Sequence, residues 1–98
     1  MEVEFADAAL DALETDPEAT CGYSREIVRG FRKAMQAIRA AEDERDLYAL
    51  RGLRFEKLKG SRSHQHSVRI NKQWRLILEF MGEGKGKKVK VVGIEDYH

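Results

Sequence analysis

Two arginines in the second half of the chain, Arg69 and Arg75, have a spacing that could hold a phosphate group. Ile70 and Trp74 are apolar and should both face the core, and the three residues 71–73 between them suit a short connection between two strands. That register places Arg69 directly across from Arg75 on the opposite face. Like charges at such a position repel each other, so something should compensate them.

The group that compensates the two arginines decides which chemistry this face can perform. Glu56 is the candidate carboxylate, because it lies on an adjacent predicted strand. A phosphate is the candidate ligand, since the planar guanidinium group matches pairs of phosphate oxygens. The alternative is that the two arginine side chains diverge into water and bind nothing.

The distribution of charge along the chain favours an anionic partner. The formal net charge of the 98 residues is +1. Residues 1–50, however, contain 6 Lys and Arg and 12 Asp and Glu, whereas residues 51–98 contain 12 and 5, together with all three histidines. This asymmetry predicts an anionic partner for the second half. The alternative is that the two halves neutralise each other in the folded protein.

The elements that must position these residues change character near residue 53. Before it, residues 6–14 and 24–41 have apolar side chains at helical spacing, and Ser24 is placed to cap the second helix. An acidic break is expected at residues 42–46, followed by a short turn of helix before Gly52.

From residue 53 onward the apolar period is two, which is typical of β-strands. The alternating segments are residues 53–58, 66–71, 74–80 and 89–94. In the last of them, Val89, Val91 and Gly93 are expected to share one face. With a short strand at residues 2–5, the pattern predicts the α+β class: an N-terminal strand and two helices packed on an antiparallel β-sheet.

The length of the chain predicts a single domain, residues 1–98. A domain of this size leaves little room for an enclosed cavity, so an active site would be a shallow groove or would be completed by a partner. No apolar run approaches the length of a membrane span. Residues 1–5 lack the apolar stretch of a secretory signal and Cys21 is the only cysteine, so a reducing cytoplasm is the expected location.

Metal binding by histidines is an alternative chemistry. His64 and His66 would lie on one strand face, and His98 could join them. The chain lacks paired cysteines and the His-Glu-x-x-His spacing that is typical of zinc sites. We therefore expect no metal and no other cofactor, with His66 at the border of the core and His64 in a loop.

Four short motifs occur in a fixed order in the second half of the chain. They are Leu53-Arg54-Phe55-Glu56-Lys57-Leu58-Lys59-Gly60, Ser67-Val68-Arg69-Ile70-Asn71, Trp74-Arg75-Leu76 and Asp96-Tyr97-His98. In this order they resemble the RelE/ParE toxin superfamily, and most of all its HigB branch. One position departs from the HigB pattern: many HigB toxins have a histidine where Glu56 stands, whereas the related YoeB toxins carry a glutamate in a similar Glu-x-Leu-Lys motif.

The resemblance implies a bacterial toxin of a type II toxin–antitoxin system. Such toxins act in the cytoplasm, cleave mRNA in the ribosomal A site and are neutralised by a helix-turn-helix antitoxin, here of the HigA type. ParE-like relatives share the fold but inhibit DNA gyrase without cleaving RNA, which makes gyrase inhibition the alternative function. An RNA-binding module without catalysis is a third reading.

The same resemblance implies roles for individual residues. Glu56 would be the general base for a ribose 2′-hydroxyl, and His98 the general acid for the leaving 5′-oxygen. The α-carboxylate of His98 is expected to favour its protonated imidazolium form. Lys59, Arg69 and Arg75 would stabilise the charge that develops on the phosphoryl oxygens. The remaining RNA contacts would come from Tyr97, Lys57, Arg62 and Lys72.

Arginines also line the predicted helix at residues 24–41, on the faces that its apolar side chains leave open. They are Arg25, Arg29, Arg32 and Arg39. These side chains could bind RNA, but a solvated helix face is the more ordinary outcome and is the one that the pattern favours.

Overall fold

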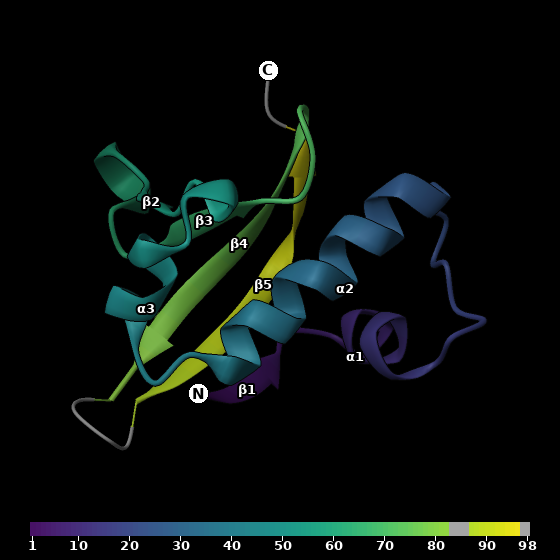
Figure 1. Ribbon diagram of the computed structural model, residues 1–98, viewed down its shortest axis with the longest axis horizontal. Helices are drawn as coiled ribbons and strands as arrows, with labels where there is room; N and C mark the ends of the chain where they lie inside the picture. Colours follow the sequence, from purple (N-terminus) through teal and green to yellow (C-terminus); the bar gives the residue numbers. More distant parts are fainter. Residues whose placement is uncertain (83–86, 97–98) are drawn as a thin grey trace.

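Helices and strands follow one another along the chain much as the sequence pattern indicates. The computed structural model describes residues 1–82 and 87–96 (Figure 1). Within them the elements are, in order, β1 (Glu2–Phe5), α1 (Ala8–Thr15), α2 (Arg25–Ala40), α3 (Glu44–Ala49), β2 (Glu56–Lys57), β3 (His66–Arg69), β4 (Trp74–Met81) and β5 (Lys88–Asp96). Two short 3-10 turns, η1 (Arg51–Leu53) and η2 (Gly60–Arg62), lie before and after β2.

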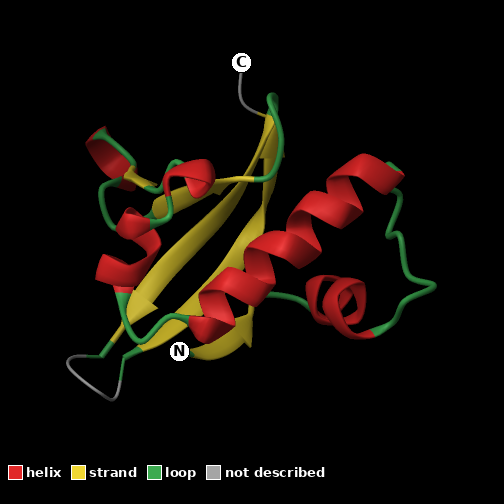
Figure 2. Cartoon of the chain, in the orientation of Figure 1, coloured by secondary structure: helices red, strands yellow, loops and turns green. Residues whose placement is uncertain are grey.

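The strands of the described residues form a five-stranded sheet in the order β1-β5-β4-β3-β2. Neighbours from β2 to β5 pair antiparallel, and β1 pairs parallel with β5 at the edge of the sheet. Helices α1 and α2 lie over the same face of the sheet (Figure 2). The predicted α+β class is therefore confirmed, and the N-terminal strand is itself part of the sheet.

The helices begin where a side chain can accept hydrogen bonds from the first turn. Asp7 Oδ1 accepts from Leu10 N at 3.0 Å before α1, and Ser24 Oγ accepts from Ile27 N at 3.3 Å before α2, as predicted for Ser24. The predicted acidic break at residues 42–46 is wrong in part. Helix α3 starts inside it, because Asp43 caps the helix by accepting from Arg45 N at 2.9 Å.

A core of apolar side chains joins the helices to one face of the sheet. Its largest fully buried members include Leu13, Phe31, Met35, Ile38, Leu47, Val68, Leu76, Leu78, Val89 and Val91. Burial of each such side chain stabilises the fold by roughly 1.5–3 kcal/mol relative to exposure. No helix among the described residues combines the length and the apolar character that crossing a membrane would need.

The last strand contains an irregularity that the sequence pattern did not predict. Ile77 pairs with Gly93, but the next residue of β4, Leu78, pairs with Val91, so Val92 is an extra residue in β5. A bulge of this kind reverses the alternation of side chains beyond it. The expectation that Gly93 shares a face with Val89 and Val91 is therefore wrong: Gly93 lies on the opposite face, and Ile94 returns to the core face.

Helix α2 and the end of β3 approach each other closely at a glycine. A Cβ atom at Gly30 would lie 2.5 Å from the backbone oxygen of Ile70 and 2.6 Å from its Cγ2 atom. Glycine weakens a helix interior, yet here only glycine allows α2 to pack against the strand that carries Arg69. The helix therefore sets the position of the β3–β4 connection.

We predict that Gly30→Ala destabilises the protein although alanine is the better helix former. Alanine gains roughly 0.5–1 kcal/mol in helix propensity, while forcing a methyl group against backbone costs about 1–3 kcal/mol. A net loss of about 1 kcal/mol in the free energy of unfolding should appear in urea denaturation. Gly52→Ala is the control, because a Cβ there meets nothing within 4 Å. Equal stabilities for the two variants would contradict the close approach.

Candidate functional site

A buried arginine lies at the centre of the candidate site, on the sheet face that the helices do not cover. The guanidinium group of Arg75 donates from Nε and Nη2 to Ser67 Oγ, at 3.1 and 2.9 Å. Nη2 also donates to the backbone oxygen of Arg54, at 2.6 Å. Glu56 Oε1 lies 3.5 Å from the same nitrogen. These acceptors hold the guanidinium plane in one orientation, with its charge close to the surface.

Strand register brings these groups together. Glu56 on β2 pairs with Ser67 on β3, and Arg69 on β3 pairs with Arg75 on β4, so all four side chains share one face. The predicted pairing of the two arginines is thus confirmed, and Glu56 is the nearby carboxylate. Arg75 does not diverge into water, since only 8% of the residue is exposed.

Arg54 belongs to the site, and sequence reasoning missed it. The predicted strand at residues 53–58 is wrong in its first half: residues 51–53 form η1, and β2 covers only Glu56–Lys57. Arg54 ends the turn with a left-handed backbone, φ 45° and ψ 48°, which is unusual for a residue other than glycine. That conformation accompanies the bond from its carbonyl oxygen to Arg75. The arginine lacks the sequence signal that a glycine or asparagine would have given.

A small, strongly basic hollow opens beside Arg75; we call it the basic hollow. Its lining residues are Arg54, Arg69, Asn71, Lys72 and Arg75, and its volume is about 270 Å³. One water molecule takes up roughly 30 Å³ in the liquid, so a phosphate group fits. The four cations would meet its oxygens from several directions.

Asn71 shapes the connection between β3 and β4 that borders the basic hollow. Its Oδ1 atom accepts from the backbone nitrogens of Gln73 and Trp74, at 2.9 and 2.8 Å. Its backbone oxygen accepts from Arg69 Nε at 3.2 Å. The asparagine therefore fixes both the turn and the position of the Arg69 guanidinium group.

Of the other predicted site residues, one lines the basic hollow, three lie elsewhere in the described structure and two lie outside it. Lys72 lines the basic hollow. Lys59 is exposed just before η2; its backbone oxygen accepts from Arg62 N at 3.3 Å, and its side chain makes no hydrogen bond or ion pair with another described residue. Lys57 pairs with His66 and faces the helix side of the sheet. Tyr97 and His98 lie outside the described residues, and the last described residue, Asp96, pairs with Trp74 and accepts from Gln73 Nε2 at 3.0 Å.

Arg62, predicted to contact RNA, has protein partners. Its Nη1 and Nη2 atoms donate to the two oxygens of Glu95, at 2.9 and 2.6 Å, and its Nε donates to Gln65 Oε1 at 2.9 Å. Gln65 Nε2 in turn donates to Glu79 Oε2 at 2.8 Å. These bonds tie the segment between β2 and β3 to β4 and β5. The geometry favours a structural role for Arg62, and its contact with RNA stays a prediction.

His66 is part of an aromatic cluster. Its ring stacks on Phe55, with ring centroids 5.0 Å apart and planes 6° apart, and meets the edge of Phe80 at 5.2 Å. Burial lowers the pKa of His66 below its ordinary value of 6.5, an effect that Glu44 opposes and Lys57 supports. Among residues 1–82 and 87–96, no group of three or more His, Cys, Asp or Glu side chains is arranged to hold a metal ion.

Comparison with known proteins places this site in a family. A family model described as "RelE-like toxin of type II toxin-antitoxin system HigB" matches residues 3–98, nearly the entire chain. The chain belongs to the HigB family of RelE-like toxins. It is 32% identical over 81 residues to Toxin HigB-1 of Vibrio cholerae serotype O1, a match that covers 83% of this chain and 85% of that one.

The fold of this HigB-family chain is also similar to a solved structure described as "YoeB/ParE toxin from Agrobacterium tumefaciens". The TM-score is 0.62 and the alignment covers 100% of both chains, while the sequence identity is 18%. At that identity the likeness concerns the fold alone. Family membership makes the chain the toxin of a type II toxin–antitoxin system, with an antitoxin as its implied partner.

We predict that Ser67→Ala lowers stability and loosens Arg75. Ser67 is fully buried and accepts two bonds from the guanidinium group. Hydrogen bonds to charged groups contribute about 1.5–3 kcal/mol, so the free energy of unfolding in urea should fall by roughly that amount. Ser61→Ala, on an exposed turn, should stay within about 0.5 kcal/mol of the parent. An unchanged stability for Ser67→Ala would show that the serine does not hold the arginine.

We predict that the free energy of unfolding decreases as the pH is lowered, because His66 is protonated more readily in the unfolded chain than in the folded one. In the unfolded chain the imidazole has its ordinary pKa of 6.5, whereas burial lowers the pKa in the folded chain. As pH drops below about 6.5, the unfolded state takes up the proton first, and the free energy of unfolding decreases until the folded pKa is passed. Urea denaturation at about pH 7.5 and about pH 5 measures the decrease. His66→Phe should reduce it, and an equal decrease in this variant would refute the assignment.

Proposed function

We propose that this toxin is a ribosome-dependent endoribonuclease that cleaves translated mRNA in the ribosomal A site without a metal ion. The observation that carries the proposal is the juxtaposition of Glu56 with the buried guanidinium of Arg75, at 3.5 Å, beside the basic hollow. A carboxylate that can accept a proton next to several cations, of which Arg75 is held in place, is the equipment that phosphodiester cleavage through a neighbouring hydroxyl needs.

The proposed reaction begins at the ribose on the 5′ side of the scissile phosphate. Glu56 accepts the proton of the 2′-hydroxyl, and the 2′-oxygen forms a bond to phosphorus. The bond between phosphorus and the 5′-oxygen breaks, and His98 donates a proton to that oxygen. The products are a 2′,3′-cyclic phosphate and a 5′-hydroxyl. Each positioned acid or base contributes about 10²–10⁴-fold to the rate.

Cations of the basic hollow would stabilise the charge that develops on the phosphoryl oxygens. Arg75 is already fixed by Ser67 and the carbonyl of Arg54, so its donors need no reorganisation during the reaction. Arg69 at the end of β3 and Lys72 in the β3–β4 connection also line the hollow. Lys59 is proposed to join them when RNA is bound, and Tyr97, Lys57 and Arg62 to contact the substrate.

Dependence on the ribosome follows from how open the site is. The Glu56 side chain is 54% exposed, and the basic hollow is a small surface depression of about 270 Å³. Such a surface cannot by itself align the 2′-hydroxyl, phosphorus and leaving oxygen in one line, which is where much of the catalytic advantage arises. The ribosome, which already holds the mRNA in the A site, would supply that alignment. A helix-turn-helix antitoxin of the HigA type is the proposed inhibitor.

We expect Glu56→Gln to reduce cleavage by about 10²–10⁴-fold, because an amide cannot accept the proton. Arg75→Lys should also reduce it, since an ammonium group lacks the planar fork that Ser67 and Arg54 hold. His98→Ala should reduce it to a degree similar to Glu56→Gln. Cleavage is measured with purified toxin on ribosomes that carry a defined mRNA. Glu4→Gln on β1, exposed and remote from the site, is the matched control.

Mapping of mRNA 5′ ends after induced expression in a bacterium separates this function from its alternative. Cuts in phase with codons, present with the parent and absent with Glu56→Gln, are expected. Growth arrest without such cuts, together with inhibition of DNA gyrase in a supercoiling assay, would instead establish a ParE-like toxin. Full cleavage by a correctly folded Glu56→Gln protein would show that another group is the base.

A further inference from the structure

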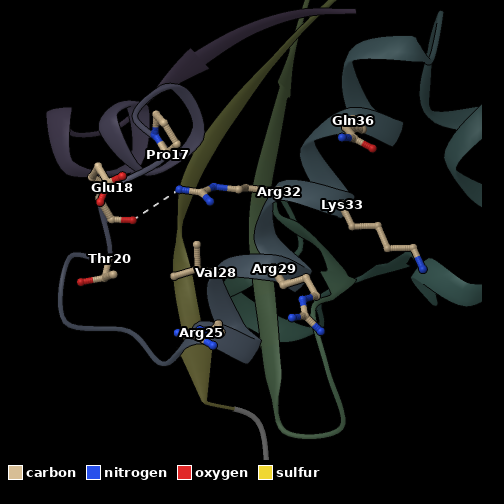
Figure 3. A pocket seen from close by; sticks show the side chains of 10 residues that line it. Pro17, Glu18, Thr20, Arg25, Val28, Arg29, Arg32, Lys33 and Gln36 are labelled. Carbon is tan, nitrogen blue, oxygen red and sulfur yellow. Dashed lines mark hydrogen bonds between the residues drawn. The ribbon is translucent and has the colours of Figure 1, made fainter.

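The basic hollow continues into two larger depressions along α2. The first, which we call the central groove, lies between α2, the segment at residues 49–53 and the end of β3; its volume is about 930 Å³, and it shares Arg69 and Asn71 with the basic hollow. The second, the helix hollow, lies between α2 and residues 17–20; its volume is about 610 Å³, and it shares Lys33 and Gln36 with the central groove (Figure 3). The three depressions therefore adjoin one another in series.

Cations dominate the far end of this surface. Arg25, Arg29 and Lys33 are spaced four residues apart on α2, so they share one helix face. All three are exposed, and none of their side chains makes a hydrogen bond or ion pair with another described residue. Arg32 differs: it donates to the backbone oxygens of Leu13, Asp16 and Ala19, and Figure 3 shows it turned toward residues 17–20 while Lys33 extends away from them.

The positive charge of the surface along α2 does not reflect the composition of the half of the chain that contains this helix. Residues 1–50 contain twice as many acidic as basic residues, 12 against 6. Nevertheless Glu18 is the only carboxylate among the described residues that line the helix hollow, and none lines the central groove or the basic hollow. Folding therefore collects positive charge along one path and leaves most of the negative charge elsewhere, an arrangement that attracts a polyanion to that path.

The central groove combines an apolar floor with charged edges. Ala34, Ala37, Leu53 and Ile70 line it, and so does Leu50, which is 47% exposed. Lys33, Arg51 and Arg69 line the same groove. Apolar surface beside a row of cations suits a single nucleic acid strand, whose bases pack on the apolar part while its phosphates meet the charges.

We propose that the mRNA strand that flanks the cleavage site lies along this path. With the scissile phosphate in the basic hollow, the flanking nucleotides would occupy the central groove, and the next phosphates would contact Lys33, Arg29 and Arg25. The placement rests on the proposed function, because that function puts the scissile phosphate in the basic hollow. Continuity of the three depressions and the near absence of carboxylates favour single-stranded RNA over a peptide as the occupant.

Binding of RNA of two lengths tests the placement. The protein carries Glu56→Gln, so that the RNA stays intact, and binding is followed by the fluorescence anisotropy of labelled single strands of about 12 and about 3 nucleotides. The test variant adds Arg25→Gln, Arg29→Gln and Lys33→Gln. The control adds Arg45→Gln, Lys88→Gln and Lys90→Gln, which removes the same charge away from the path. Circular dichroism and thermal unfolding confirm that both variants fold.

We expect the test variant to bind the long RNA at least about tenfold more weakly than the control and to bind the short RNA equally well. Each phosphate contact on a single strand contributes about 0.7 to the slope of log K against log salt concentration. Loss of three contacts should therefore lower the slope for the long RNA by about 2. Equal affinities and slopes in the test and control variants would overturn the placement.

Two further outcomes separate this inference from related ones. If the test variant keeps its affinity for RNA but loses affinity for the purified antitoxin, the path binds protein, and the placement of RNA is wrong. If the test variant binds the long RNA more weakly as expected but the parent toxin never cleaves mRNA on ribosomes, single-stranded RNA binds along the path and the proposed nuclease function fails.

Discussion

The contacts that hold the buried guanidinium group of Arg75 organise both the candidate site and the sheet. Placing the Arg75 guanidinium inside a protein is costly unless its donors are satisfied. Here Nε and Nη2 donate to Ser67 from the neighbouring strand, Nη2 also donates to the carbonyl of Arg54 from the preceding turn, and the carboxylate of Glu56 lies nearby. Each acceptor has the right position only when β2, β3 and β4 are in register and the chain at Arg54 adopts its left-handed conformation. The site and the sheet are therefore specified by the same contacts.

One face of the sheet forms the core, and the opposite face carries the candidate site. One face, under α1 and α2, holds the apolar core, which supplies most of the stability. The other carries Ser67, Arg69, Arg75 and Glu95, and the segment between β2 and β3 is tied over part of it through Arg62 and Gln65. A small chain can in this way keep a polar, accessible site without interrupting its core. The bulge at Val92 serves the same division, because it returns Ile94 to the core face after Gly93 has faced the other way.

Membership of the HigB family gives this arrangement a context. A toxin that acts inside a larger assembly does not need a deep pocket, since the assembly can hold and align the substrate. The open basic hollow, the half-exposed Glu56 and the cationic path along α2 are consistent with such a division of labour. Under the proposed function, the toxin would contribute cations and a base, and the ribosome would contribute the geometry of the RNA.

The sequence by itself determined the fold class, the family and the pairing of Arg69 with Arg75. These depend on local patterns, namely apolar periodicity, a three-residue connection and a set of ordered motifs, each readable from neighbouring residues. Only the tertiary structure decided the contribution of Arg54, the bulge, the parallel pairing of β1 with β5 and the meeting of Lys33 with Arg69 in one groove. All four arise between segments distant in the sequence, or from a backbone conformation that packing imposes on an ordinary residue, and neither leaves a local pattern. Tyr97 and His98 lie outside the described residues, so their roles are still those that the family resemblance implies.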